Sequence, residues 1–134
     1  MMKALGIHIV GDLYECEESL LLKGETGEKL LNMAVALSGL NKIFTTSRDF
    51  EPGGYTAIVV LSESHISIHT WPELRAALID VFTCGDEQQA FVAFDVLVDN
   101  LKPRRVEKKV LQRGTERKNF RQREVSDSQK IVAP

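Results

Sequence analysis

The side chains that could take part in catalysis are concentrated in one stretch of the 134-residue sequence, from Leu61 to Glu73. Hydroxyl, carboxylate and imidazole groups alternate there with isoleucines, and proteins use such groups as nucleophiles and as general acids and bases. Farther along, Cys84 stands just ahead of a predicted helix, whose N-terminal N–H groups favour a thiolate, although a lone cysteine is more often a small buried residue. The polar residues of the stretch are Ser62, Glu63, Ser64, His65, Ser67, His69, Thr70 and Glu73.

The histidines His65 and His69 invite comparison with a metal site. Residues four apart on a strand are separated by about 13 Å, which is too far for two adjacent ligands of one ion. The two cysteines, Cys16 and Cys84, lie far apart in the sequence and form no Cys-x-x-Cys pair. The sequence therefore predicts no metal site.

Familiar catalytic loops are also missing from the sequence. It contains no Gly-x-Ser-x-Gly elbow, no Walker loop and no Gly-x-Gly-x-x-Gly opening a helix. Glycines such as Gly53 and Gly54 are simpler to interpret as turn residues than as a phosphate cradle. By pattern alone, the segment Ser62-Glu63-Ser64-His65 is an ordinary polar turn between two strands, and this interpretation stays open at this point.

The elements that must position these residues follow from the spacing of apolar side chains. Alternation and β-branched runs predict strands over 4–13, 42–46, 55–61, 64–69, 76–82 and 106–111. Helical periodicity predicts one helix over 26–38, ended by Gly39, and a second from Asp86 to Leu101. Asp86 and Gln89 form the predicted capping pair of the second helix.

The predicted strand over 64–69 has two different faces. Ile66 and Ile68 fall on one face, whereas His65, Ser67 and His69 fall on the other. Short links among the middle strands favour antiparallel pairing with both helices on one face of the sheet. We therefore predict an α+β fold, a two-layer sandwich whose uncovered sheet face is buried by self-association, most simply in a dimer.

Composition narrows the class of protein. The net charge of −2 argues against a dedicated nucleic-acid binder, and no apolar run approaches the length of a membrane span. The N-terminus lacks a signal-peptide core, and two distant cysteines make no disulfide framework, so we expect a cytoplasmic protein. We expect one domain over 1–112 and a polar, flexible tail with many basic residues over 113–134.

The stretch from Leu61 to Glu73 resembles part of a known protein family. The block from Leu61 to Glu73, followed by Phe82-Thr83-Cys84-Gly85, resembles the prokaryotic S-adenosylmethionine decarboxylase proenzymes, which are pyruvoyl-dependent and cut themselves. The resemblance covers about residues 4 to 112. The further matching motifs are Gly6-x-His8, Tyr14-Glu15-Cys16 and Phe50-x-Pro52-x-Gly54.

The resemblance implies a self-cleavage step. In that family the bond matching Glu63–Ser64 is broken by the serine hydroxyl through an N→O acyl shift, and β-elimination and hydrolysis then leave a pyruvoyl group. The cofactor would thus be covalent and derived from Ser64, and the products would be chains 1–63 and 64–134. His69 matches the histidine assigned to processing. Thr56 stands where the family commonly has a serine that supports processing, so a hydroxyl is kept.

The resemblance also assigns roles in turnover. The substrate amine would form a Schiff base with the pyruvoyl ketone, which accepts electrons as the carboxylate leaves. Cys84 matches the proton donor. Glu73 matches a carboxylate that binds the ribose, Phe50 matches the aromatic that stacks on adenine, and Trp71 also favours a nucleoside. The substrate implied is S-adenosylmethionine, and the product would be the aminopropyl donor for spermidine synthesis.

Two alternatives remain beside this hypothesis. Tyr55, Arg75 and Ala76 depart from the family pattern around the presumed adenosine pocket, which suggests an arginine or ornithine decarboxylase of the same family. A protein of another class, an uncleaved binding or regulatory homologue, is the third candidate. The family implies a homodimer with its site at the subunit interface. Strict strand alternation would put Ser64 and His69 on opposite faces, so a shared site requires the chain to bend near Ser64.

Overall fold

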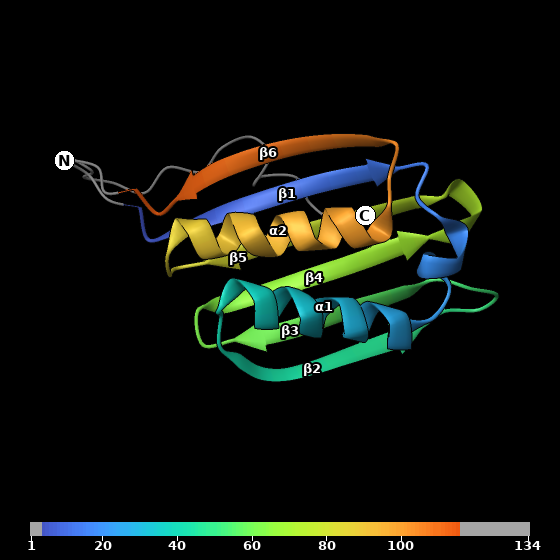
Figure 1. Ribbon diagram of the computed structural model, residues 1–134, viewed down its shortest axis with the longest axis horizontal. Coiled ribbons are helices and arrows are strands. Elements are labelled where there is room, and N and C mark those ends of the chain that lie inside the picture. The colour runs from blue at the N-terminus through green and yellow to red at the C-terminus, as the bar shows by residue number, and fades with distance from the viewer. Residues whose placement is uncertain (1–3, 116–134) are drawn as a thin grey trace, which may run out of the picture.

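The computed structural model describes residues 4–115. Within them the chain forms one sheet of six antiparallel strands in the order β2-β3-β4-β5-β1-β6. Two helices, α1 (Gly24–Ser38) and α2 (Glu87–Leu101), lie side by side on one face of the sheet (Figure 1). The strands are β1 (Gly6–Tyr14), β2 (Lys42–Asp49), β3 (Tyr55–Leu61), β4 (Ser64–Trp71), β5 (Ala76–Thr83) and β6 (Arg105–Arg113).

This arrangement confirms the predicted α+β fold with an antiparallel sheet and both helices on one face. Most predicted boundaries hold within two residues, and β3 has the predicted ends. The strand predicted over 42–46 is longer and runs to Asp49, because it pairs along the whole of β3. Single 3₁₀ turns, η1 (Glu18–Leu21) and η2 (Pro72–Leu74), were not predicted. The predicted tail lies mostly outside the described residues.

The helix ends show how local sequence fixes the elements. Gly39 ends α1 in the left-handed conformation, with φ 80°, which glycine adopts without steric cost. Asp86 caps α2 by accepting a hydrogen bond from the Gln88 N–H at 2.9 Å. The predicted partner in this cap is wrong, because the Gln89 side chain donates to the Gly39 carbonyl instead.

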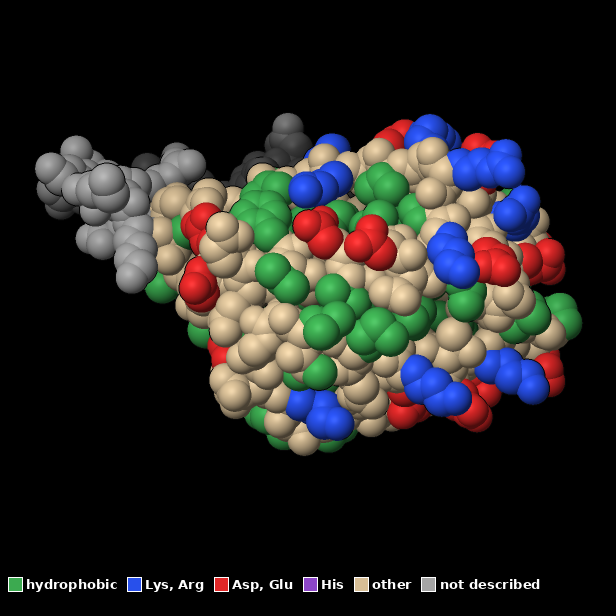
Figure 2. Space-filling model, in the orientation of Figure 1, with side chains coloured by type: hydrophobic (Ala, Val, Ile, Leu, Met, Phe, Trp, Pro, Cys, Tyr) green, Lys and Arg blue, Asp and Glu red, His purple; other side chains and the backbone are tan. Residues whose placement is uncertain are grey.

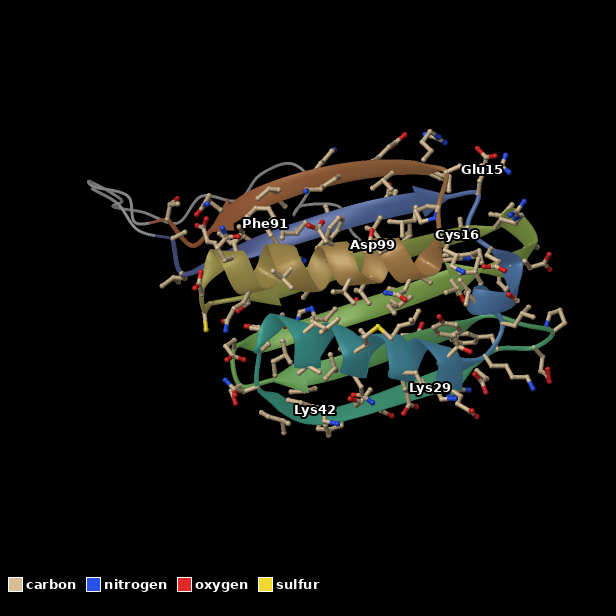
Figure 3. The ribbon with its side chains drawn as sticks, in the orientation of Figure 1. Glu15, Cys16, Lys29, Lys42, Phe91 and Asp99 are labelled. Atoms are coloured by element: carbon tan, nitrogen blue, oxygen red, sulfur yellow. The ribbon has the colours of Figure 1, made fainter. Side chains whose placement is uncertain are left out.

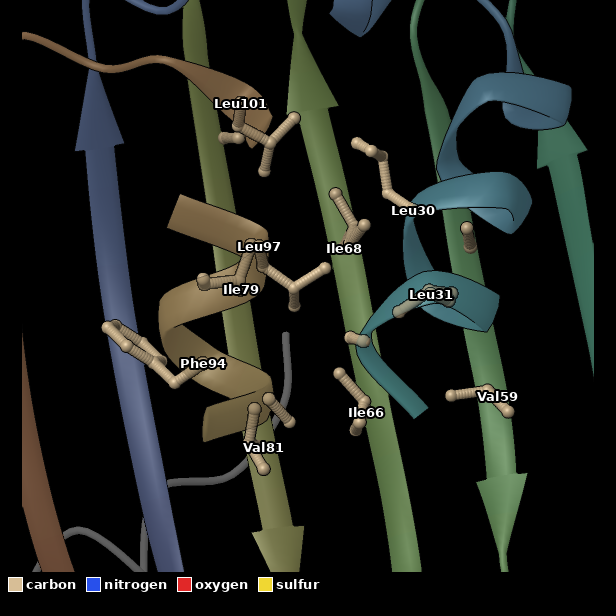
Figure 4. Packing of buried hydrophobic residues seen from close by; sticks show 14 of the residues in the cluster. Leu30, Leu31, Val59, Ile66, Ile68, Ile79, Val81, Phe94, Leu97 and Leu101 are labelled. Carbon is tan, nitrogen blue, oxygen red and sulfur yellow. The ribbon is translucent and has the colours of Figure 1, made fainter. Parts of the chain in front are cut away.

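The core lies between the helices and one face of the sheet. Ile66 and Ile68 of β4 are fully buried there, as their alternation predicted. Burial of side chains of this size stabilises a fold by about 1.5–3 kcal/mol each. The residues that pack together in Figure 4 include Leu30, Leu31, Val59, Ile79, Val81, Phe94, Leu97 and Leu101.

The opposite face of the sheet is not covered by any described element. His8, His65 and His69 lie on it, and so do the apolar residues opposite them on neighbouring strands. Leu78 and Leu111, on this face, are 37% and 45% exposed. The helical side, shown in Figure 2, has charged side chains around a central apolar band. The uncovered sheet face is therefore a mixed surface of apolar and polar side chains, which we call the open face.

Candidate active site

The predicted cleavage site is a two-residue turn between β3 and β4. Leu61 and Ser64 face each other across it, and Ser62 and Glu63 form its tip. Ser64 has φ 145°, a backbone conformation that side-chain-bearing residues rarely adopt. Such residues cost of order 1–3 kcal/mol and persist where surrounding contacts hold them. Ser64 still pairs in register with Leu61 and Thr83, so its unusual backbone conformation marks the start of β4 and does not bring Ser64 near His69.

Cys84 lies beside this turn. Ser64 pairs with Thr83, the last residue of β5, so Cys84, which follows that strand, lies next to the scissile bond. The Cys84 N–H donates to the Glu63 carbonyl oxygen at 3.0 Å. Cys84 is exposed. The structure therefore brings together three of the predicted site residues, Glu63, Ser64 and Cys84, and we call them the cleavage set.

The remaining predicted residues line a pocket of about 570 Å³ at the other end of β4. His69 and Thr56 lie directly opposite each other on β4 and β3, and Thr56 Oγ1 is 3.1 Å from His69 Nδ1. The pocket mouth is aromatic, since Phe50 is 48% and Trp71 39% exposed. We call Phe50, Thr56, His69, Trp71 and Glu73 the pocket set.

A hydrogen-bond network fixes the tautomer of His69. The Ser67 hydroxyl donates to Asp80 Oδ2 at 2.5 Å, so Ser67 Oγ can only accept from the His69 Nε2–H at 3.4 Å. His69 Nδ1 then carries the lone pair, and it accepts from the Thr56 hydroxyl. The imidazole is held in one orientation from both sides.

Asp80 is the centre of this network and was not among the predicted site residues. Its Oδ1 accepts from His8 Nε2 at 3.2 Å and from His65 Nε2 at 3.1 Å. Arg113 donates to His8 Nδ1, which leaves His8 Nε2 as the nitrogen that carries hydrogen. The only sequence signal for Asp80 was its position in the strand after the histidines.

The cleavage set and the pocket set do not meet within one chain. Ser64 and His69 are five residues apart on β4, a separation of about 17 Å on an extended strand. Ser64 pairs with Thr83, whereas His69 pairs with Leu78. The cleavage set and the pocket set are therefore two separate groups of residues along β4 and its neighbours.

Two of the three departures that suggested another substrate, Tyr55 and Arg75, have polar groups that donate to backbone carbonyls, although Tyr55 also lines the pocket. The Tyr55 hydroxyl donates inward to the Leu20 carbonyl at 3.0 Å. Burial, assisted by the nearby Cys16, raises the pKa of Tyr55 well above its usual range. Arg75 is not among the lining residues, and its Nε donates at 2.8 Å to the carbonyl of Cys16, which follows β1 (Figure 3).

Two further observations concern the described residues alone. Over 4–115, no group of three His, Cys, Asp or Glu side chains is placed to hold a metal ion. In the same range neither helix has the length and apolar character needed to cross a membrane.

Comparison with known proteins gives consistent matches. A model of the S-adenosylmethionine decarboxylase family matches residues 7–114. A protein of a Hydrogenobaculum species is 46% identical over 114 residues, which are 85% of each chain. A protein of Aquifex aeolicus is 41% identical over 132 residues, which are 98% of each chain. Both relatives are named S-adenosylmethionine decarboxylase proenzyme.

A solved structure matches as well. The crystal structure of the adenosylmethionine decarboxylase from Aquifex aeolicus superposes with a TM-score of 0.82 at 42% identity. The match covers 90% of this chain and 99% of that chain. These comparisons do not support the arginine or ornithine alternative.

Proposed function

This chain belongs to the S-adenosylmethionine decarboxylase family, and from that premise we propose that it decarboxylates S-adenosylmethionine with a pyruvoyl group made from its own Ser64. The product is the aminopropyl donor for spermidine synthesis. The observation that carries the proposal is the bent turn at Ser64, whose scissile carbonyl accepts a hydrogen bond from the Cys84 N–H.

The first step is an exchange of bonds at the turn. Ser64 Oγ attacks the Glu63 carbonyl carbon, the peptide C–N bond breaks, and the hydroxyl proton moves to the freed Ser64 amine. The carbonyl oxygen becomes negative during the attack, and the Cys84 N–H, 3.0 Å away, is aimed at that charge. The unusual backbone at Ser64 favours reaction, because cleavage releases the strain.

The second step removes the Ser64 Cα proton. The ester oxygen then leaves with Glu63 as its carboxylate, and the dehydroalanine that remains hydrolyses to pyruvoyl with release of ammonia. We assign His69 as the base for this step. Its Nδ1 accepts a hydrogen bond from the Thr56 hydroxyl, which can relay the Cα proton to the imidazole. The chains produced are 1–63 and 64–134.

A second copy of the chain completes the site. We place the two open faces against each other, since the exposed apolar residues Phe44, Leu78 and Leu111 would then be buried. Stacked sheets lie about 10 Å apart. Suppose that the two-fold axis relating the chains lies midway between the two sheets and is perpendicular to the strands. The Ser64 end of β4 in each chain then lies over the His69 end of β4 in the other chain. Each cleavage set then meets the partner's pocket set.

In the completed site, the pocket set holds the substrate. Phe50 and Trp71 supply aromatic surface for the adenine and the sulfonium ion, and the Glu73 carboxylate suits the ribose hydroxyls. The pyruvoyl ketone supplies the electron sink for loss of the carboxyl group. Cys84 lies at the cleavage set and is exposed, so its thiol is the proton donor that we assign to the product.

Mass spectrometry of the purified protein tests the proposal. Two fragments, 1–63 and 64–134, are expected, with the second beginning in pyruvoyl instead of serine. Cyanoborohydride reduction in the presence of S-adenosylmethionine should link the substrate amine to residue 64, while arginine and ornithine should give no adduct. A single uncut chain of full mass would reject the proposal.

A further inference from the structure

The scissile turn is tied to a residue that no motif singles out. Asn41, in the loop between α1 and β2, donates its side-chain Nδ2–H to Glu63 Oε2 at 2.7 Å. Its backbone N–H donates to Glu63 Oε1 at 3.2 Å. Its carbonyl oxygen accepts from the Ser62 N–H at 2.9 Å. One residue thus makes three hydrogen bonds to the two residues at the tip of the turn.

The other side of Glu63 is held as well. The Cys84 N–H fixes the Glu63 carbonyl oxygen, as described above. A Cβ atom added at Gly85 would lie 3.2 Å from Glu63 Cγ, so the Glu63 side chain runs tightly along this backbone. Glu63 is therefore held at its carboxylate by Asn41 and at its carbonyl by Cys84.

We propose that Asn41 is a positioning residue for self-cleavage, which acts by holding the Glu63 carboxylate and thereby the orientation of the Glu63–Ser64 peptide. The inference rests on the proposed function, since it concerns the same bond. An intramolecular attack is fast only when the reacting atoms are held close and aligned. Ser64 Oγ must approach the Glu63 carbonyl from above its plane. The hydrogen bonds from the Asn41 side chain and the Cys84 N–H to Glu63 set the orientation of that plane.

The charge of Glu63 makes the grip stronger than a neutral contact. A carboxylate with two N–H donors, one on each oxygen, is held in a fixed plane. The hydrogen bonds lie at the surface of the molecule, so they contribute little to global stability. Their effect is expected on the rate of cleavage and not on folding.

The test follows the cleavage of freshly purified, full-length precursor by mass spectrometry and gel electrophoresis. Asn41→Ala removes the Nδ2 donor and is expected to slow cleavage about tenfold, the effect of losing one hydrogen bond to a charged group. Asn41→Asp sets two carboxylates against each other and should slow cleavage further. Asn41→Asp combined with Glu63→Gln restores a donor and an acceptor and should recover most of the rate.

Asn32→Ala is the matched control. The Asn32 side chain accepts hydrogen bonds from Thr45 at 2.7 Å and from Lys42 at 3.4 Å, both in β2, and makes none to Ser62 or Glu63 of the turn. The thermal midpoint, measured for each variant in a Ser64→Ala background that stays uncut, should be the same for Asn41→Ala and Asn32→Ala.

The outcomes separate the two proposals. Failure of the unmodified chain to cleave would reject the proposed function, and this inference with it. Normal cleavage of the unmodified chain with an equally fast Asn41→Ala would overturn the inference alone. The inference would also be overturned if Asn32→Ala slowed cleavage as much as Asn41→Ala does. It would be overturned as well if Glu63→Gln failed to restore cleavage in the Asn41→Asp chain, because Asn41 would then have only a structural role.

Discussion

Ser64 and His69 lie toward opposite ends of β4, about 17 Å apart on an extended strand. The proposed self-cleavage nevertheless uses both residues. The strand is central in the sheet and paired on both sides, so it cannot fold back to bring them together. We propose that a second chain, laid across the first, brings the other set of residues to Ser64.

Chains that carry Ser64→Ala and chains that carry His69→Ala should complement each other. Each variant alone should fail to produce pyruvoyl, because every site in its homodimer lacks one half. In a mixed dimer, one site combines the intact Ser64 of one chain with the intact His69 of the other. Co-expression with two different tags, followed by mass spectrometry of the doubly tagged dimer, should show that the His69→Ala chain is cut. Absence of cleavage in that dimer would place Ser64 and His69 in separate functions.

Cys84→Ala should separate cleavage from turnover. The group that touches the scissile carbonyl is the main-chain N–H of residue 84, which alanine keeps. The variant should therefore be cut, whereas decarboxylation should fall about 100-fold or more because the proton donor is lost. Release of labelled carbon dioxide per mole of pyruvoyl measures the effect. Normal turnover would remove the thiol from the mechanism.

Leu78→Glu should prevent dimerisation. Leu78 is partly exposed on the open face, so the substitution does not disturb the core of one chain but would bury a charge between two chains. Analytical ultracentrifugation should show a folded monomer that is not cut. Leu37→Glu is the matched control, because Leu37 is 63% exposed on the helical side. A Leu37→Glu chain that is monomeric, or a Leu78→Glu chain that stays dimeric, would contradict the face-to-face arrangement.

Tyr55 should make stability fall at alkaline pH. Its pKa in the folded chain is raised above the ordinary value of 10.0, chiefly by burial and secondly by Cys16. Above pH 10 the unfolded chain loses the phenol proton while the folded chain keeps it, so unfolding becomes more favourable as pH rises. Below pH 10 this contribution to stability is fully present.

Tyr55→Phe tests this pH dependence. At pH 7 the variant should be about 1 kcal/mol less stable, because the hydrogen bond to the Leu20 carbonyl is lost. The difference from the unmodified chain should shrink as pH rises past 10, since phenylalanine has no proton to lose. Urea unfolding between pH 7 and 11 measures the difference in stability at each pH, and the Ser64→Ala background keeps the chain uncut. A difference that stays constant over this range would show that Tyr55 does not titrate as described.

Local sequence determined the elements and their faces. The alternation of Ile66 and Ile68 with His65, Ser67 and His69 predicted the buried and open sides of β4, because successive side chains on a strand point to opposite faces. Gly39 marked the end of α1 for an equally local reason. The residue types of the stretch from Leu61 to Glu73 alone indicated only a polar turn, and the expectation of self-cleavage came from its resemblance to the S-adenosylmethionine decarboxylase family.

Tertiary structure alone decided what these residues touch. His8 meets Asp80, which is 72 positions away, because β1 pairs with β5 in one particular register, and register depends on packing across the whole sheet. Asn41 meets Glu63 because the loop after α1 returns beside the turn of another hairpin. The distance between Ser64 and His69 could have been estimated from their spacing. Only the sheet shows that β4 keeps its register from Ser64 to His69, because it is paired with a strand on each side along that length, so the two residues stay apart within one chain.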